Sequence, residues 1–87
     1  MRDIRQAIHE AARLVSSDSY EYMNKAKALD KKGKKKEAVE LYDKVIEHEP
    51  DNDEAYIHKG LSLTDLGKNA EAIQAFDQAI KLDPNNY

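Results

Sequence analysis

Cysteine is absent from the 87 residues of this sequence. The chain therefore has no disulfide bonds and offers no thiolate ligand to a metal ion. Because nothing in the composition indicates an oxidising compartment, we predict a cytoplasmic protein.

Long apolar runs are absent as well. The segment Met1–Ser17 is interrupted by charged side chains along its whole length, as a secretory signal or a membrane span would not be. We therefore expect neither of them, and no membrane span in the protein. The charged residues of this segment are Arg2, Asp3, Arg5, Glu10 and Arg13.

The sequence also lacks the patterns that carry catalysis. It has no glycine-rich phosphate loop, and no serine stands in a nucleophile elbow. His9 and Glu10 resemble the start of a zinc-binding helix, but Arg13 stands where the second histidine ligand is needed. We expect no enzyme activity, no cofactor and no metal site.

Charge of one sign is not in excess either. Charged residues make up 36% of the chain, yet the net charge is only −3. The one dense cluster, the lysines within 31–36, surrounds Gly33 and has no aromatic residues between its members for base stacking. We interpret it as a solvated turn and expect no nucleic-acid partner.

What the sequence does contain is an internal repeat of 34 residues. When residues 19–52 are placed over residues 53–86, eleven of the 34 positions are identical. Conservative pairs such as Tyr42 and Phe76 add to the match. We predict a first repeat over 18–52, a second over 53–86, and Tyr87 as the start of a third repeat that is missing.

Within this frame the apolar residues follow the spacing of helix faces, and no stretch alternates as a strand does. We predict an all-α array of helix-turn-helix repeats with about five helices. The first is an N-terminal amphipathic helix over 1–17, which is either half of a preceding repeat or an unrelated cap. The other four span about 18–32, 36–49, 53–66 and 70–82.

Local signals mark the ends of these helices. Asp18 with Glu21 has the spacing of a capping box, which predicts a helix start there. Gly33 and Gly67 stand where a left-handed residue ends a helix, and Pro50 and Pro84 exclude helix after the second element of each repeat.

The spacing of these residue types resembles the tetratricopeptide repeat. The second block has an aromatic at position 4, small residues at 8, 20 and 27, an aromatic at 24 and proline at 32, and the first block differs mainly at Val45. These positions are held by Tyr56, Gly60, Ala72, Ala79, Phe76 and Pro84. Small residues allow close helix approach, and aromatics fill the space between layers.

The resemblance implies a non-enzymatic scaffold that binds a peptide or helix of a partner protein on a concave face. That face is formed by the first helix of each repeat. Carried over position by position, the resemblance implies these partner-binding residues: Tyr20, Met23, Asn24, Lys27, Glu54, Ile57, His58 and Leu61. The alternative for Met23, Ile57 and Leu61 is that they complete the core under the N-terminal helix or a neighbouring helix. We do not expect the carboxylate clamp of some members, because Met23, Lys27 and His58 replace its first three residues.

An alternative function is self-association. A single repeat does not bury its apolar face alone, and stable arrays tend to need about three repeats. The last predicted helix carries Ile73, Phe76 and Ile80, and no later helix follows to cover them. The sequence therefore also predicts an assembly scaffold that forms a homodimer through its terminal helices.

Overall fold

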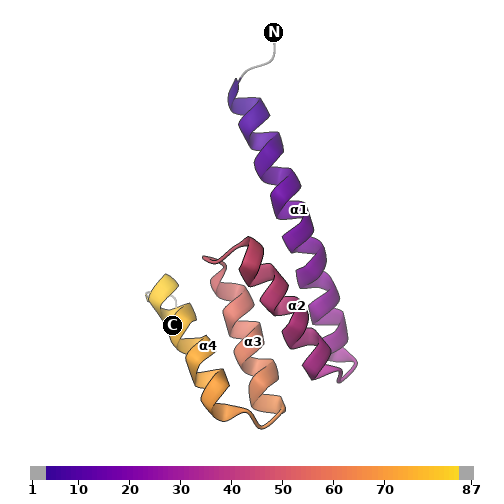
Figure 1. Cartoon of the computed structure of the whole chain (residues 1–87), viewed down its shortest axis with the longest axis vertical. Coiled ribbons are helices and arrows are strands. Elements are labelled where there is room, and N and C mark those ends of the chain that lie inside the picture. The colour runs from indigo at the N-terminus through magenta and orange to yellow at the C-terminus, as the bar shows by residue number, and fades with distance from the viewer. Residues whose placement is uncertain (1–3, 85–87) are drawn as a thin grey trace.

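The computed structural model describes the backbone of residues 4–84 and the side chains of residues 18–84. In this part every element of regular secondary structure is a helix, which confirms the all-α prediction. Its four helices follow one another as neighbours, α1 packing on α2, α2 on α3 and α3 on α4 (Figure 1). Their bounds are Ile4–Lys31 for α1, Lys35–His48 for α2, Asp53–Asp65 for α3 and Asn69–Leu82 for α4.

The number of helices corrects the prediction of about five. Residues 4–31 form one continuous helix, so that Asp18 lies inside α1 and does not begin a new helix. The physical reason is that no glycine or proline interrupts the chain before Gly33. A capping residue ends a helix only where the backbone also turns. In Figure 1 the N-terminal part of α1 projects beyond the layer formed by the other helices.

Both predicted glycine turns are present. Gly33 has φ +82° and Gly67 has φ +79°, the left-handed conformation that glycine adopts without a Cβ penalty. At the first turn the N–H of Lys34 donates to the carbonyl of Leu29 at 2.9 Å, and the second turn repeats this bond from Lys68 to Leu63 at 2.8 Å. These bonds satisfy the last carbonyls of α1 and α3.

The connection between α2 and α3 is set by a cap. The side chain of Asn52 accepts a hydrogen bond at 3.1 Å from the N–H of Ala55, in the first turn of α3. Its amide nitrogen donates to Glu49 at 3.2 Å, across Pro50. Asn52 thus joins the end of one repeat to the beginning of the next.

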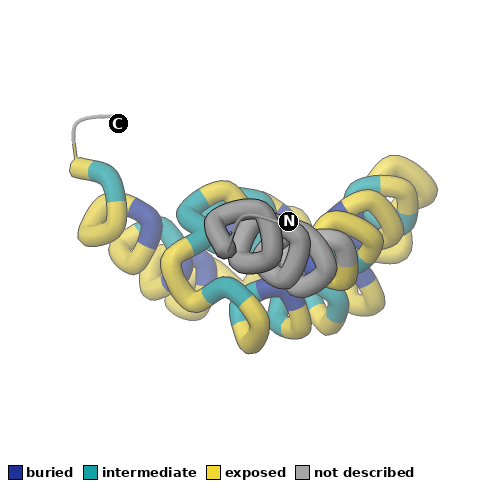
Figure 2. The backbone as a smooth tube through the Cα atoms, turned by 90° about the horizontal axis from the view of Figure 1, so that it is seen from above, coloured by how far each residue is buried: buried dark blue, intermediate teal, exposed yellow. Residues whose placement is uncertain are grey.

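The core lies between the helices and consists largely of small side chains. Figure 2 shows the buried turns in dark blue where helices face a neighbour, with exposed residues on the outer sides. The predicted small positions are among the most buried of the described residues, as close helix approach requires. They are Ala26, Ala38, Gly60, Ala72 and Ala79, with Val45 in the place of one of them.

The far side of α4 is more open. Ile73 is 60% exposed and Ile80 is 46% exposed, while Phe76 is half-buried. Phe76 packs against α3, whereas no described helix covers Ile73 and Ile80. Among the residues that the structure describes, none of the helices combines the length and the apolar character needed to cross a membrane.

Candidate partner-binding groove

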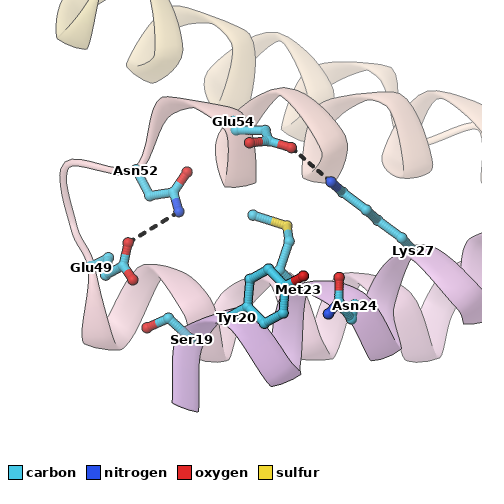
Figure 3. Close-up of a pocket in the computed structure, with 8 residues that line it drawn as sticks. All are labelled: Ser19, Tyr20, Met23, Asn24, Lys27, Glu49, Asn52 and Glu54. Carbon is cyan, nitrogen blue, oxygen red and sulfur yellow. Dashed lines mark hydrogen bonds and ion pairs between the residues drawn. The ribbon is translucent and has the colours of Figure 1, made fainter. Parts of the chain in front are cut away.

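A hollow of about 290 Å³ lies between α1 and the beginning of α3 (Figure 3). Side chains on α1 form one wall, and the turn before α3 together with its first residues forms the other. Met23 points from α1 into the space between the walls. The hollow is lined by Ser19, Tyr20, Met23, Asn24, Lys27, Glu49, Asn52 and Glu54.

One ion pair crosses the groove from the first repeat to the second. The Nζ of Lys27 on α1 lies 2.8 Å from Oε1 of Glu54 on α3. On its other side the same carboxylate oxygen lies 3.4 Å from Nε2 of His58. The hydrogen bond from Lys27 lowers the pKa of Glu54, and His58 acts in the same direction. Glu54 is therefore a charged group on the α3 wall of the groove.

Five of the eight predicted partner-binding residues line this hollow together. Tyr20 is 68% exposed and stands at its edge, whereas Met23 is only 7% exposed and forms part of its floor. The others are Asn24, Lys27 and Glu54.

The other three predicted residues lie elsewhere. His58 lines a second hollow, Ile57 lines an apolar hollow beside α4, and Leu61 lies 50% exposed on α3. The structure thus places the predicted set along the surface of the two first helices, in more than one hollow.

The second hollow, of about 370 Å³, shares Lys27 with the first. At its base Asp30 of α1 receives hydrogen bonds from two other helices. The hydroxyl of Tyr42 on α2 donates to Oδ2 at 3.2 Å, and the hydroxyl of Ser62 on α3 donates to Oδ1 at 3.0 Å. Lys35 lies 2.8 Å from the same carboxylate and 3.2 Å from Asp65.

We call Asp30 and its partners Tyr42, Ser62 and Lys35 the hub. These contacts determine the charge state of the Asp30 carboxyl group. Burial raises the pKa of Asp30, but the hydrogen bonds from Lys35, Ser62 and Tyr42 outweigh burial, so that its pKa lies below the usual value. Burial and the neighbouring Asp30 carboxylate raise the pKa of Tyr42 far above its ordinary range. The hub is thus a carboxylate held by a neutral phenol and a lysine.

Two aromatic stacks join α2 to the first helices of the two repeats. The rings of Tyr42 and His58 are 5.6 Å apart and nearly parallel, which joins α2 to α3. Tyr22 and His48 form a similar stack at 5.7 Å, with Lys44 over the face of Tyr22. Both histidines therefore have a packing role that their isolation in the sequence does not indicate.

A third, wholly apolar hollow of about 280 Å³ lies on the open side of the second repeat. It is lined by Ile57 from α3 and by Phe76, Ala79 and Ile80 from α4. It has no charged or polar lining residue, so it differs in chemistry from the two hollows between α1 and α3.

Sequence reasoning missed several residues of the site. Ser19 and Glu49 line the first hollow, and the hub of Asp30 brings Lys35 and Ser62 together. Lys35 belongs to the lysine cluster that the sequence analysis assigned to solvent, but it forms two ion pairs. The signal available for Asn52 was its place as a capping residue after Pro50. No comparable pattern marks the others.

Comparison with protein families identifies one match over most of the chain. A family model described as tetratricopeptide repeat matches residues 23–87. A search of curated proteins finds no match to the chain.

Proposed function

Because the chain belongs to the tetratricopeptide repeat family, as the match over residues 23–87 shows, we propose that it is a non-catalytic module for protein interaction. Its groove between α1 and α3 binds an extended or helical segment of a partner protein. We further propose that it acts in the cytoplasm, which agrees with its lack of cysteine.

The observation that carries this proposal is the hollow between the two first helices. Its lining combines the exposed ring of Tyr20, the apolar floor at Met23, and the charged pair of Lys27 and Glu54. The lining is mainly polar, with Tyr20 and Met23 as its apolar contacts, so it is suited to hold one side chain of a segment and to hydrogen-bond to its backbone.

The residues contribute in different ways. Tyr20 offers a large, rigid and amphipathic contact, the kind that commonly dominates binding energy. Lys27 and Glu54 satisfy each other in the free protein, so a partner that binds one of them must replace this contact. Met23 supports the floor and shapes the hollow from below.

The test begins with a peptide selected from a displayed random library against the whole chain. Its affinity is then measured by calorimetry for Tyr20→Ala and Lys27→Glu, with Lys36→Glu as the control on the exposed surface of α2. We expect each groove variant to weaken binding roughly fivefold or more, as the loss of a central contact does. Circular dichroism checks that each variant remains helical.

The opposite pattern would contradict the proposal. If Lys36→Glu weakened binding while both groove variants bound as the original chain does, the peptide site would lie outside the groove.

Self-association through the terminal helices is the second candidate function. It is favoured by the open side of α4, where Ile73 and Ile80 are exposed next to the apolar hollow. The two candidates respond to different changes. Lys27→Glu is expected to weaken peptide binding and leave association unchanged, whereas Ile80→Glu is expected to do the reverse.

A further inference from the structure

The junction between α2 and α3 consists of two matching stripes of side chains. As whole residues they are buried or half-buried, and α2 packs directly on α3. The stripe on α2 consists of Val39, Tyr42, Asp43 and Ile46, and the stripe on α3 consists of Ala55, His58, Lys59 and Ser62. An ion pair of 2.6 Å between Lys59 and Asp43 and the stack of Tyr42 on His58 join them.

The internal repeat places the same two stripes on the outer sides of the array. Adding 34 to the α2 positions gives Ile73, Phe76, Asp77 and Ile80 on α4. All of these except the half-buried Phe76 are exposed. Subtracting 34 from the α3 positions gives Glu21, Asn24, Lys25 and Ala28 on α1, all exposed. The chain thus has a second copy of each stripe. The equivalent of the α2 stripe lies on α4, and the equivalent of the α3 stripe lies on α1.

The charges on the two end stripes are complementary. Asp77 occupies the position of Asp43, and Lys25 occupies the position of Lys59. Neither has an ion-pair partner among the described side chains. If α4 of one copy lay on α1 of another as α2 lies on α3, Asp77 and Lys25 would meet as Asp43 and Lys59 do.

A second contact of the internal junction has an apolar counterpart. The ion pair of Lys27 with Glu54 crosses from the first repeat to the second. The equivalent positions across the two ends are Leu61 and Tyr20, which are large, exposed apolar side chains in the described parts of α3 and α1. Together they would bury apolar surface where the internal junction has an ion pair.

We propose that a second copy of the chain stacks head to tail on the first, with the Ile73–Ile80 stripe of α4 lying on residues 18–31 of α1. This proposal rests on self-association, the second candidate function, and specifies its geometry. The contact is heterologous, because each copy contributes its α4 to one neighbour and its α1 to another. Such contacts generate open rows or rings, not a closed two-fold dimer.

One residue limits the strength of this contact. Glu21 occupies the position that the fully buried Ala55 holds in the internal junction. A carboxylate placed against the apolar hollow must remain solvated, which opposes close approach. Glu21→Ala is therefore expected to strengthen association, an effect opposite to that of the other substitutions.

The test is molar mass by sedimentation equilibrium over a hundredfold range of concentration, because mass action then resolves weak association. Mass is expected to rise with concentration for the original chain, and Glu21→Ala is expected to shift the rise to lower concentration. Ile80→Glu should abolish it. Lys81→Glu, at the next residue and exposed on another side of α4, is the matched control and should leave it unchanged.

A charge exchange tests the geometry itself. Lys25→Glu and Asp77→Lys each place like charges across the contact, and each variant alone should associate roughly threefold more weakly. Mixed in equal amounts, the two variants have opposite charges at every contact, so association should return.

Two results would overturn the proposal. If the original chain and Glu21→Ala both stay monomeric throughout, neither self-association nor this geometry holds. If the chain associates and Ile80→Glu prevents it, but neither charge variant nor their mixture has any effect, self-association holds and the head-to-tail geometry is wrong.

Discussion

The ring of Phe76 lies directly against the backbone of Gly60. A Cβ added at Gly60 would stand 2.6 Å from Cε1 of this ring, closer than van der Waals contact allows. The equivalent pair in the first repeat is Ala26 and Tyr42, both fully buried. The second repeat therefore requires an even smaller residue at this crossing than the first.

We expect Gly60→Ala to destabilise the protein by about 1–2 kcal/mol. Overpacking against the ring costs about 1–3 kcal/mol, and the better helix propensity of alanine offsets part of this cost. Urea unfolding followed by circular dichroism measures the effect. Adding Phe76→Leu should recover part of the lost stability. If Gly60→Ala were as stable as the original protein, the packing of α4 on α3 at Gly60 would have room for the added methyl group.

The hub at Asp30 predicts a loss of stability in acid. Its pKa is lowered in the folded protein, so its contribution is present above the unfolded pKa of about 3.8 and is lost as pH falls through the folded value. Glu54 acts in the same direction below about 4.5. The free energy of unfolding should therefore fall as pH is lowered from 5.

Asp30→Asn tests the assignment. The variant should be less stable at neutral pH and should lose less on acidification, because the amide cannot be protonated in this range. Urea unfolding at several pH values gives both quantities, and Glu47→Gln, exposed on α2, is the matched control. An unchanged acid dependence in Asp30→Asn would assign the effect to other carboxylates.

A substitution at Gly67 should lower stability through the backbone conformation alone, without a steric clash. An added Cβ there meets nothing within 4 Å, yet the residue has φ +79°. Gly67→Ala should cost about 1 kcal/mol through the left-handed conformation alone. Gly67→Asn should cost less, because asparagine tolerates this conformation. Thermal unfolding compares the two variants, and equal midpoints would contradict a purely conformational cost.

The sequence predicted most of the fold because the local signals and the repeat agreed. Gly33, Gly67 and Pro50 each stop a helix by backbone chemistry, and the 34-residue repeat that relates Gly33 to Gly67 and Pro50 to Pro84 placed α2, α3 and α4. The prediction failed at Asp18, where a capping side chain has no turn to accompany it. Helix propensity then continues α1 through this point.

The candidate site was predicted only as a surface. The resemblance to the tetratricopeptide repeat implies that Tyr20, Lys27 and Glu54 lie on the concave face of the first helices. It does not show which side chains meet, because that depends on how helices far apart in the sequence cross. The contacts of Asp30 with Tyr42 and Ser62 arise from such crossings, 12 and 32 residues away.

Lys27 lines both hollows between α1 and α3, and this shared side chain has a thermodynamic consequence. Any group that binds its ammonium in one hollow also removes a positive charge from the wall of the other. Occupancy of the two hollows is therefore linked through a coupling free energy, which acts equally in both directions. A partner segment long enough to occupy both hollows would therefore bind with a free energy that differs from the sum of the free energies for binding each hollow alone.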